Sequence, residues 1–157
     1  MAHPAGPSPL AKLHRIAGIL AVACITSFQV ATLVAEGFLD RSAVIAVKTA
    51  LPFGLFLLVP ALATVGISGV RLARGRKGGV LGQKLRRMPI IAANGLLVLI
   101  PAALYLAAKA RAGDLDTAFY AVQGIELAAG AVNLWLMGLS IRDGLKMTAA
   151  RRRAARA

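Results

Sequence analysis

The chain has 157 residues, of which 58% are hydrophobic and 16% are charged, and its formal net charge is +13. A soluble domain of this length cannot bury so much apolar surface, so the composition excludes a soluble globular protein and predicts a polytopic membrane protein. A basic chain also suits a nucleic-acid ligand, but only 5% of the residues are aromatic and the basic residues cluster beside apolar segments. We therefore expect no nucleic-acid partner.

The first predicted elements are a disordered cytoplasmic N-terminus, residues 1–11, and an apolar span, residues 16–35. The N-terminal stretch is rich in Pro and small residues, a composition that packs poorly. The apolar run after Lys12 and Arg15 exceeds the roughly 7–15 residues of a secretory signal core, so we expect it to be retained as a membrane span. The single cysteine, Cys24, lies inside this span and excludes an intrachain disulfide.

Three further apolar segments, residues 44–70, 88–108 and 117–141, are each long enough to cross about 30 Å of hydrocarbon as a helix. Prolines inside the segments predict kinks. They are Pro52, Pro60 and Pro101. No segment shows the alternation over about ten residues that is typical of a membrane barrel.

The predicted fold class is therefore all-α, a polytopic membrane protein built as a bundle of four transmembrane helices. We assign the bundle to one domain, residues 12–147, and expect residues 148–157 to form a basic, disordered cytoplasmic tail. Short motifs recur in the two halves. Lys12-Leu13-His14-Arg15 resembles Lys84-Leu85-Arg86-Arg87, and Ala46-Val47-Lys48 resembles Ala121-Val122-Gln123. Either chance or a tandem repeat of helical hairpins explains these matches, and a repeat places Lys48 and Gln123 in corresponding positions.

The topology follows from the distribution of Lys and Arg. Basic residues precede the first span, fill the second connection and follow the fourth span. They are Lys12, Arg15, Arg71, Arg74, Arg76, Lys77, Lys84, Arg86, Arg87, Arg142, Lys146, Arg151, Arg152, Arg153 and Arg156. By the positive-inside rule both termini are cytoplasmic, and the Ala-, Gly- and Arg-rich composition is typical of a protein of the bacterial cytoplasmic (inner) membrane. The same basic clusters are suited to bind anionic lipids.

Glu126 is the only charged residue between Thr117 and Ile141, so it must lie within the depth of the bilayer. An ionisable group there costs several kcal/mol and marks a functional site by default. At about 1.5 Å per residue, Gln29 and Gln123 lie at a similar depth, in the outer half of the membrane. By the same estimate Lys48 lies at the outer rim, where its side chain would extend to water. Asn94 and Asn133 lie deeper, towards the cytoplasmic half.

Spacings of three and four residues place five residues of the fourth span on one face that points into the bundle. They are Gln123, Glu126, Gly130, Asn133 and Met137. Gly130 is expected to let another backbone approach. Leu127, Leu134 and Leu139 are expected to supply part of the lipid-facing surface.

Two interpretations of the polar residues remain open. In the first, they line an outward-opening cavity in which Glu126 binds a cation or proton, with Lys48 or Gln29 adjusting its proton affinity. In the second, the amides of Gln29, Asn94, Gln123 and Asn133 hold helices together, and Lys48 is an interface anchor or the structural ion-pair partner of Glu126.

The sequence contains no set of residues for nucleophilic catalysis and no metal-ligand cluster within the spans, so we expect neither an enzyme nor a cofactor. One alternative is a haem held by His14 and Met88 or Met147. The function predicted first is a small carrier or channel, active as a homo-oligomer. The second is a non-catalytic accessory or scaffold subunit of a larger membrane complex.

Overall fold

The computed structural model describes residues 8–73 and 79–154, and these residues form helices with short connections. Three segments lie outside the described residues: 1–7, 74–78 and 155–157. They include parts of the chain ends predicted to be disordered and part of the basic connection. The elements are α1 (Pro9–Phe38), α2 (Arg41–Ala73), α3 (Gly79–Asn94), the π-helical turn η1 (Gly95–Leu99), α4 (Ile100–Arg111) and α5 (Thr117–Ala154).

Four helical stretches are long and apolar enough to cross a membrane, which confirms the predicted fold class. They are Pro9–Phe38, Arg41–Ala73, Arg86–Arg111 and Thr117–Ala149. The third consists of most of α3 followed by η1 and α4, which continue one another. No strand occurs among the residues that the structure describes.

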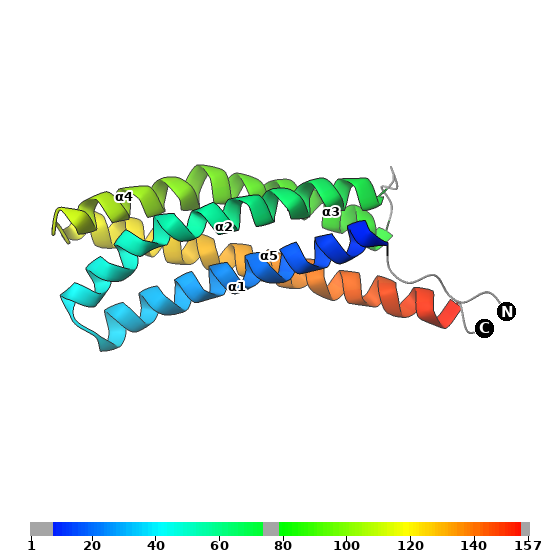
Figure 1. Cartoon of the computed structure of the whole chain (residues 1–157), viewed down its shortest axis with the longest axis horizontal. Coiled ribbons are helices and arrows are strands. Elements are labelled where there is room, and N and C mark those ends of the chain that lie inside the picture. The colour runs from blue at the N-terminus through cyan, green and yellow to red at the C-terminus, as the bar shows by residue number, and fades with distance from the viewer. Residues whose placement is uncertain (1–7, 74–78, 155–157) are drawn as a thin grey trace.

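The four spans form an antiparallel bundle of two helical hairpins (Figure 1). Helix α1 packs on α2 and α5, α2 packs on α4, and α5 packs on α3 and α4. Within the described residues, α2 and α5 make no close backbone contact, and neither do α1 and α4. These two pairs therefore lie on the diagonals of the bundle.

The two ends of the bundle differ in charge. The start of α1, the end of α2, the start of α3 and the end of α5 lie at one end (Figure 1). Exposed basic residues gather there, and we call it the basic end: Lys12, Arg15, Arg71, Arg86, Arg142 and Lys146. The α1–α2 and α4–α5 connections form the other end, which we call the neutral end because Asp40, Asp114 and Asp116 there offset Arg41, Lys109 and Arg111.

Helices extend into both segments that were expected to be disordered. Helix α1 begins at Pro9, because the Ser8 side chain accepts a hydrogen bond from the Ala11 amide and a proline fits the first helical turn. Residues 9–11 are therefore helical. Helix α5 continues to Ala154 because alanine and arginine, which dominate this stretch, are strong helix formers.

Aspartates cap the helices at the neutral end. The Asp40 carboxylate accepts the Ala43 amide at 3.0 Å, and the Asp116 carboxylate accepts the Phe119 amide at 2.8 Å. A hydrogen bond from the Ser42 hydroxyl, followed by that from the Ala43 amide, holds the pKa of Asp40 below its usual value. The Lys109 ammonium, followed by the Phe119 amide, lowers the pKa of Asp116 in the same way. Both caps thus stay charged well below neutral pH.

The prolines inside the spans have different outcomes. Helix α2 runs through Pro52 and Pro60 without a break. In the third span, Pro101 lies two residues after η1, and at the end of this turn the Ile100 amide donates to the Gly95 carbonyl, five residues back. Proline cannot donate to the carbonyl four residues back and its ring crowds that carbonyl, so a wider π turn accommodates it.

Apolar contacts fill the bundle at both ends, while the large exposed side chains form its outer surface. On α5 the exposed large residues include Ile125, Val132 and Trp135, with Trp135 71% exposed. The expected lipid-facing leucines are instead half-buried. They are Leu127, Leu134 and Leu139. The prediction was wrong because these leucines flank the inward stripe, and Leu134 packs against the apolar core of Ala21, Ile25 and Leu58.

Gly113 ends α4 with a positive φ of 68°, a conformation that disfavours any residue with a Cβ. We expect Gly113→Ala to lower the free energy of unfolding by about 1 kcal/mol, because no neighbouring atom would block the methyl group and backbone strain is the remaining effect. Unfolding in mixed detergent micelles, followed by circular dichroism, measures this change. Gly138→Ala is the matched control, since Gly138 is helical and equally open, and it should cause no loss. Equal stability of the two variants would contradict the prediction.

Candidate functional site

A buried ion pair joins the two diagonal helices α2 and α5. The Lys48 ammonium donates to the Glu126 carboxylate, and it also donates to the Thr32 hydroxyl of α1 at 3.3 Å. Lys48 is 1% exposed and Glu126 is 8% exposed. The pair therefore connects α1, α2 and α5 through a single cluster of side chains at the centre of the bundle.

The predicted rim position of Lys48 is wrong, because its side chain points into the bundle and does not extend to water. Lys48 lies on the buried face of α2 with Val44 and Leu51, four residues before it and three residues after it. The depth estimate counted the rise along α2 from Arg71, which sets the height of Lys48 but not the direction of its side chain. Helix α2 has 33 residues, which is longer than a minimal span, and Lys48 lies about two turns inside its first residue.

Gly130 brings Gln29 close to the ion pair. The Gln29 amide nitrogen donates to the Leu127 carbonyl of α5 at 2.8 Å. A Cβ on residue 130 would lie 2.7 Å from the Gln29 Oε1 atom, so only glycine leaves room for this side chain. Gly130 thus admits a polar side chain, where the sequence predicted the approach of a backbone.

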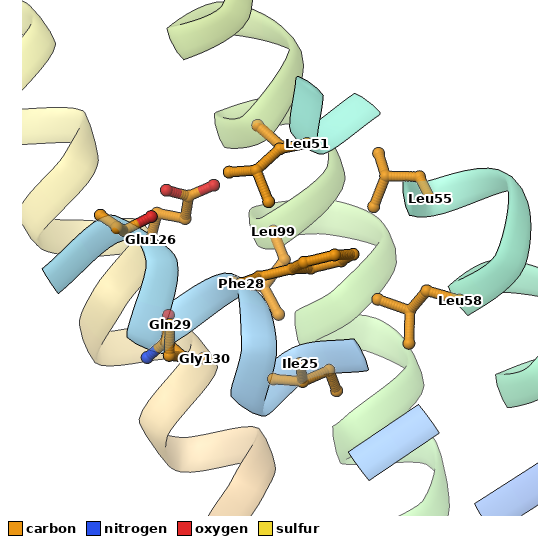
Figure 2. Close-up of a pocket in the computed structure, with 11 residues that line it drawn as sticks. Ile25, Phe28, Gln29, Leu51, Leu55, Leu58, Leu99, Glu126 and Gly130 are labelled. Carbon is orange, nitrogen blue, oxygen red and sulfur yellow. The ribbon is translucent and has the colours of Figure 1, made fainter. Parts of the chain in front are cut away.

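A small cavity lies beside Glu126 (Figure 2). Gln29, Thr32 and Glu126 give it one polar side, and leucines of α2 with Ile25 and Phe28 of α1 give it an apolar side. Its volume is about 40 Å³. By the same measure a cavity needs roughly 10–15 Å³ to hold one water molecule, so this one has room for more than one. The cavity therefore fits water or a proton carried by water, and it is too small for an organic solute.

A second polar layer lies about two helical turns further towards the basic end. The Asn94 amide donates to the Asn133 side chain and to the Ala129 carbonyl, both at 2.9 Å. Asn133 is fully buried, and its own amide donates to the Ile91 carbonyl at 3.5 Å. Asn94 directly precedes η1. This layer joins α3 to α5 and satisfies the amide hydrogen-bonding groups on this side of Glu126.

Gln123 lies on the buried stripe as predicted, but it does not join the hydrogen bonds around Glu126. It is 5% exposed, and its Oε1 atom has no hydrogen-bond partner in the described part of the chain. The other four members of the predicted stripe are also buried, so the assignment of this face to the bundle interior is correct. Of the six candidate residues, the structure therefore places Glu126 and Gln29 at the cavity, pairs Lys48 with Glu126, pairs Asn94 with Asn133, and leaves Gln123 separate.

Two polar contacts escaped the sequence analysis. Thr32 accepts from Lys48, and its position three residues after Gln29 on the same face of α1 was the available signal. Asp143 is 5% exposed and accepts from Arg87 at 2.6 Å, which joins α3 to α5 near the basic end. Arg87 was assigned only to the charge asymmetry, while Asp143 falls two residues beyond the last residue of the predicted fourth span.

The His14 side chain contacts Ser68, with its Nδ1 atom 2.8 Å from the Ser68 hydroxyl. Met88 and His14 both lie against Gly69, so the structure brings together two of the residues considered as haem ligands. The Ser68 hydroxyl already engages one ring nitrogen of His14. Among the residues the structure describes, no three His, Cys, Asp or Glu side chains lie close enough to hold a metal ion together.

The fold and the site define an integral membrane four-helix bundle with a buried, hydrogen-bonded ion pair. Comparison of the chain with family models, with curated proteins and with solved structures finds no match.

The contact between Gly130 and Gln29 gives a test of the local packing. We expect Gly130→Ala to lower the melting temperature, because the methyl group displaces Gln29 and breaks its hydrogen bond to Leu127. Adding Gln29→Ala should cause little further loss, since the clash and the hydrogen bond are then both absent. Gly124→Ala is the control, because nothing lies near that position. Purely additive losses in the double variant would refute the contact.

The ion pair gives a second test. We expect Lys48→Met or Glu126→Leu alone to lower the free energy of unfolding by about 3–5 kcal/mol, because each leaves one buried charge without its partner. The double variant should lose much less than the sum, since both charges are then gone. A double-mutant cycle in mixed micelles measures the coupling. Zero coupling would mean that the two groups do not interact in the folded protein.

Proposed function

We propose that this protein is a small proton-coupled carrier of the membrane, in which Lys48 and Glu126 form the proton-exchange site. One observation carries this proposal: the carboxylate and the ammonium face each other beside a cavity of about 40 Å³ in an otherwise apolar part of the bundle. A buried ion pair is weak as a purely structural device, because apolar residues of similar volume often stabilise a protein as well or better. Ionisable groups inside membrane spans commonly belong to ion or proton pathways.

The small size of the cavity favours a proton over a metal ion or an organic solute as the ligand of Glu126. A metal ion or an organic solute needs several ligands or a larger space, and Lys48 already provides the positive charge next to the carboxylate. A proton needs neither. Binding of a proton converts the pair into an ammonium beside a neutral acid, which weakens the attraction between α2 and α5 and links protonation to their separation.

The path of the transported solute then lies between copies of the chain, because the cavity beside Glu126 inside one bundle of four helices is too small for it. We propose a homo-oligomer in the bacterial inner membrane, with the basic end in the cytoplasm and its exposed Lys and Arg side chains against anionic lipid headgroups. Each such side chain contributes about 1 kcal/mol near an anionic surface.

A second candidate function is that of an accessory subunit of a larger membrane complex. The outer face of α5 favours it, because Gly124 and Gly138 have no neighbour in the chain and flank the exposed Trp135. Glycines that no helix of the same chain approaches are suited to close contact with a helix of another protein. Native mass spectrometry after purification in mild detergent separates the two candidates. A larger partner bound at a fixed ratio supports the accessory subunit, and a homo-oligomer supports the carrier.

Proton uptake by reconstituted protein tests the carrier directly. In liposomes with an internal pH dye and a valinomycin-imposed potassium potential, we expect wild-type protein to take up protons and Glu126→Gln to lose this activity. Glutamine keeps the size and hydrogen bonding of the side chain but cannot titrate. Asp114→Asn is the matched control, since it removes a carboxylate that lies at the neutral end with its side chain 51% exposed, and it should retain uptake.

If Glu126→Gln does not fold, the double variant Lys48→Met, Glu126→Gln replaces it, because it leaves no unpaired charge. Wild-type uptake no faster than that of protein-free liposomes would refute the proposal. Full uptake by a folded Glu126→Gln protein would refute it as well.

A further inference from the structure

Two buried oxygen atoms on one side of the Lys48–Glu126 pair lack hydrogen-bond partners. They are Oε1 of Gln123 on α5 and Oε1 of Glu36 on α1, and each is buried in the described part of the structure. Gln123 as a whole is 5% exposed, and Glu36 is half-buried. A buried acceptor without a donor loses the hydrogen bonds that it would make in water, so such atoms normally hold water or a ligand.

Both atoms lie between the ion pair and the neutral end. Gln123 precedes Glu126 by one turn on α5, which begins at the neutral end. Glu36 follows Thr32 by one turn on α1, which ends there, and Thr32 accepts from Lys48. At 1.5 Å per residue the two residues are displaced by about 4.5 and 6 Å in the same direction along the bundle.

The polar groups on the opposite side are already engaged. Gln29 donates to Leu127, Asn94 bonds Asn133, and Arg87 pairs with Asp143. These three contacts join α5 to α1 and to α3 in successive layers towards the basic end. The two buried oxygen atoms without a partner therefore both lie towards the neutral end, whereas these side chains towards the basic end each have at least one partner in the described structure.

We propose that Glu36 and Gln123 form a second site, which holds water and relays protons between the neutral end and Glu126. This inference rests on the proposed proton exchange at Glu126. Both open atoms are acceptors, so the site is suited to a donor such as water or hydronium. Gln123 does not titrate and holds the water, while Glu36 is the carboxylate that takes up the proton.

In the proposed relay, a proton from bulk water first binds the Glu36 carboxylate. The resulting acid gives a proton to the water at Gln123, and that water gives one of its protons to the Glu126 carboxylate. Glu36 is then again a carboxylate, the water is unchanged, and Glu126 is a neutral acid beside the Lys48 ammonium.

Silver ions, which are small and react with thiols, test the hydration of this site without any transport assay. In a Cys24→Ser background, single cysteines replace Gln123 or Asn133, which are both buried on the same stripe on either side of Glu126. The purified variants are exposed to Ag⁺ in detergent, and the remaining thiols are counted with a fluorescent maleimide after unfolding. We expect the cysteine at position 123 to react at least tenfold faster than that at position 133. Equal rates, or a faster reaction at 133, would overturn the proposal.

Proton uptake by Glu36→Gln in liposomes tests the relay itself. We expect uptake to fall at least fivefold, while Asp114→Asn keeps the wild-type rate. Unchanged uptake by Glu36→Gln with lost uptake by Glu126→Gln would overturn the relay and leave the carrier intact. Absence of uptake by wild-type protein would instead refute the carrier, and with it the relay, even if the cysteine at position 123 reacts with silver.

Discussion

The attraction between the Lys48 ammonium and the Glu126 carboxylate is the interaction on which the rest of the bundle depends. Neither charge is tolerable alone at this depth, since an isolated ionised group in hydrocarbon costs several kcal/mol. The two side chains come from the diagonal helices α2 and α5, whose backbones do not touch in the described residues. The ion pair therefore fixes the rotation of α2 and α5 about their own axes and the relative height of these two helices in the bundle. A shift of α2 by one residue would turn Lys48 out of the centre by about 100°.

Helix α5 carries this constraint along its length. Three buried polar residues of α5 each contact a different part of the bundle. Glu126 contacts α2, Asn133 contacts the end of α3, and Asp143 contacts Arg87 nearer the start of α3. Polar contacts inside a membrane contribute modestly to stability, at about 0.6 kcal/mol on average. Their stronger effect is on specificity, because a wrong rotation of α5 would expose three polar groups to lipid at once. Gly130 belongs to the buried stripe of this helix and adds a steric condition, because a Cβ at this position would clash with Gln29 of α1.

The sequence predicted the parts of this structure that follow from hydropathy and helical period. The number of spans depends on apolar length alone, and the inward face of α5 follows from residues spaced three and four apart. The partner of Glu126 did not follow, because position 48 was placed by counting from one end of a helix that is longer than the span. The neighbour of Gly130 was missed for a related reason: sequence shows that space is needed but not which atom fills it. Nothing in the sequence distinguishes Arg87 and Asp143 from the other basic and acidic residues. Their contact becomes evident only when α3 and α5 are known to lie side by side.

The difference between the two ends gives the ion pair a direction. Towards the basic end, amides and an Arg–Asp pair use their donors and acceptors on one another, so a proton there meets groups that already have partners. Towards the neutral end, Glu36 and Gln123 keep open acceptors within about one turn of the pair. A structural ion pair has no need of such an asymmetry, since its stability depends on being closed on every side. Under the proposed function this asymmetry matters, because open acceptors lie on the side from which protons would arrive. The cavity beside Glu126 then needs room only for the water that carries the proton, and a larger space would admit competing ions.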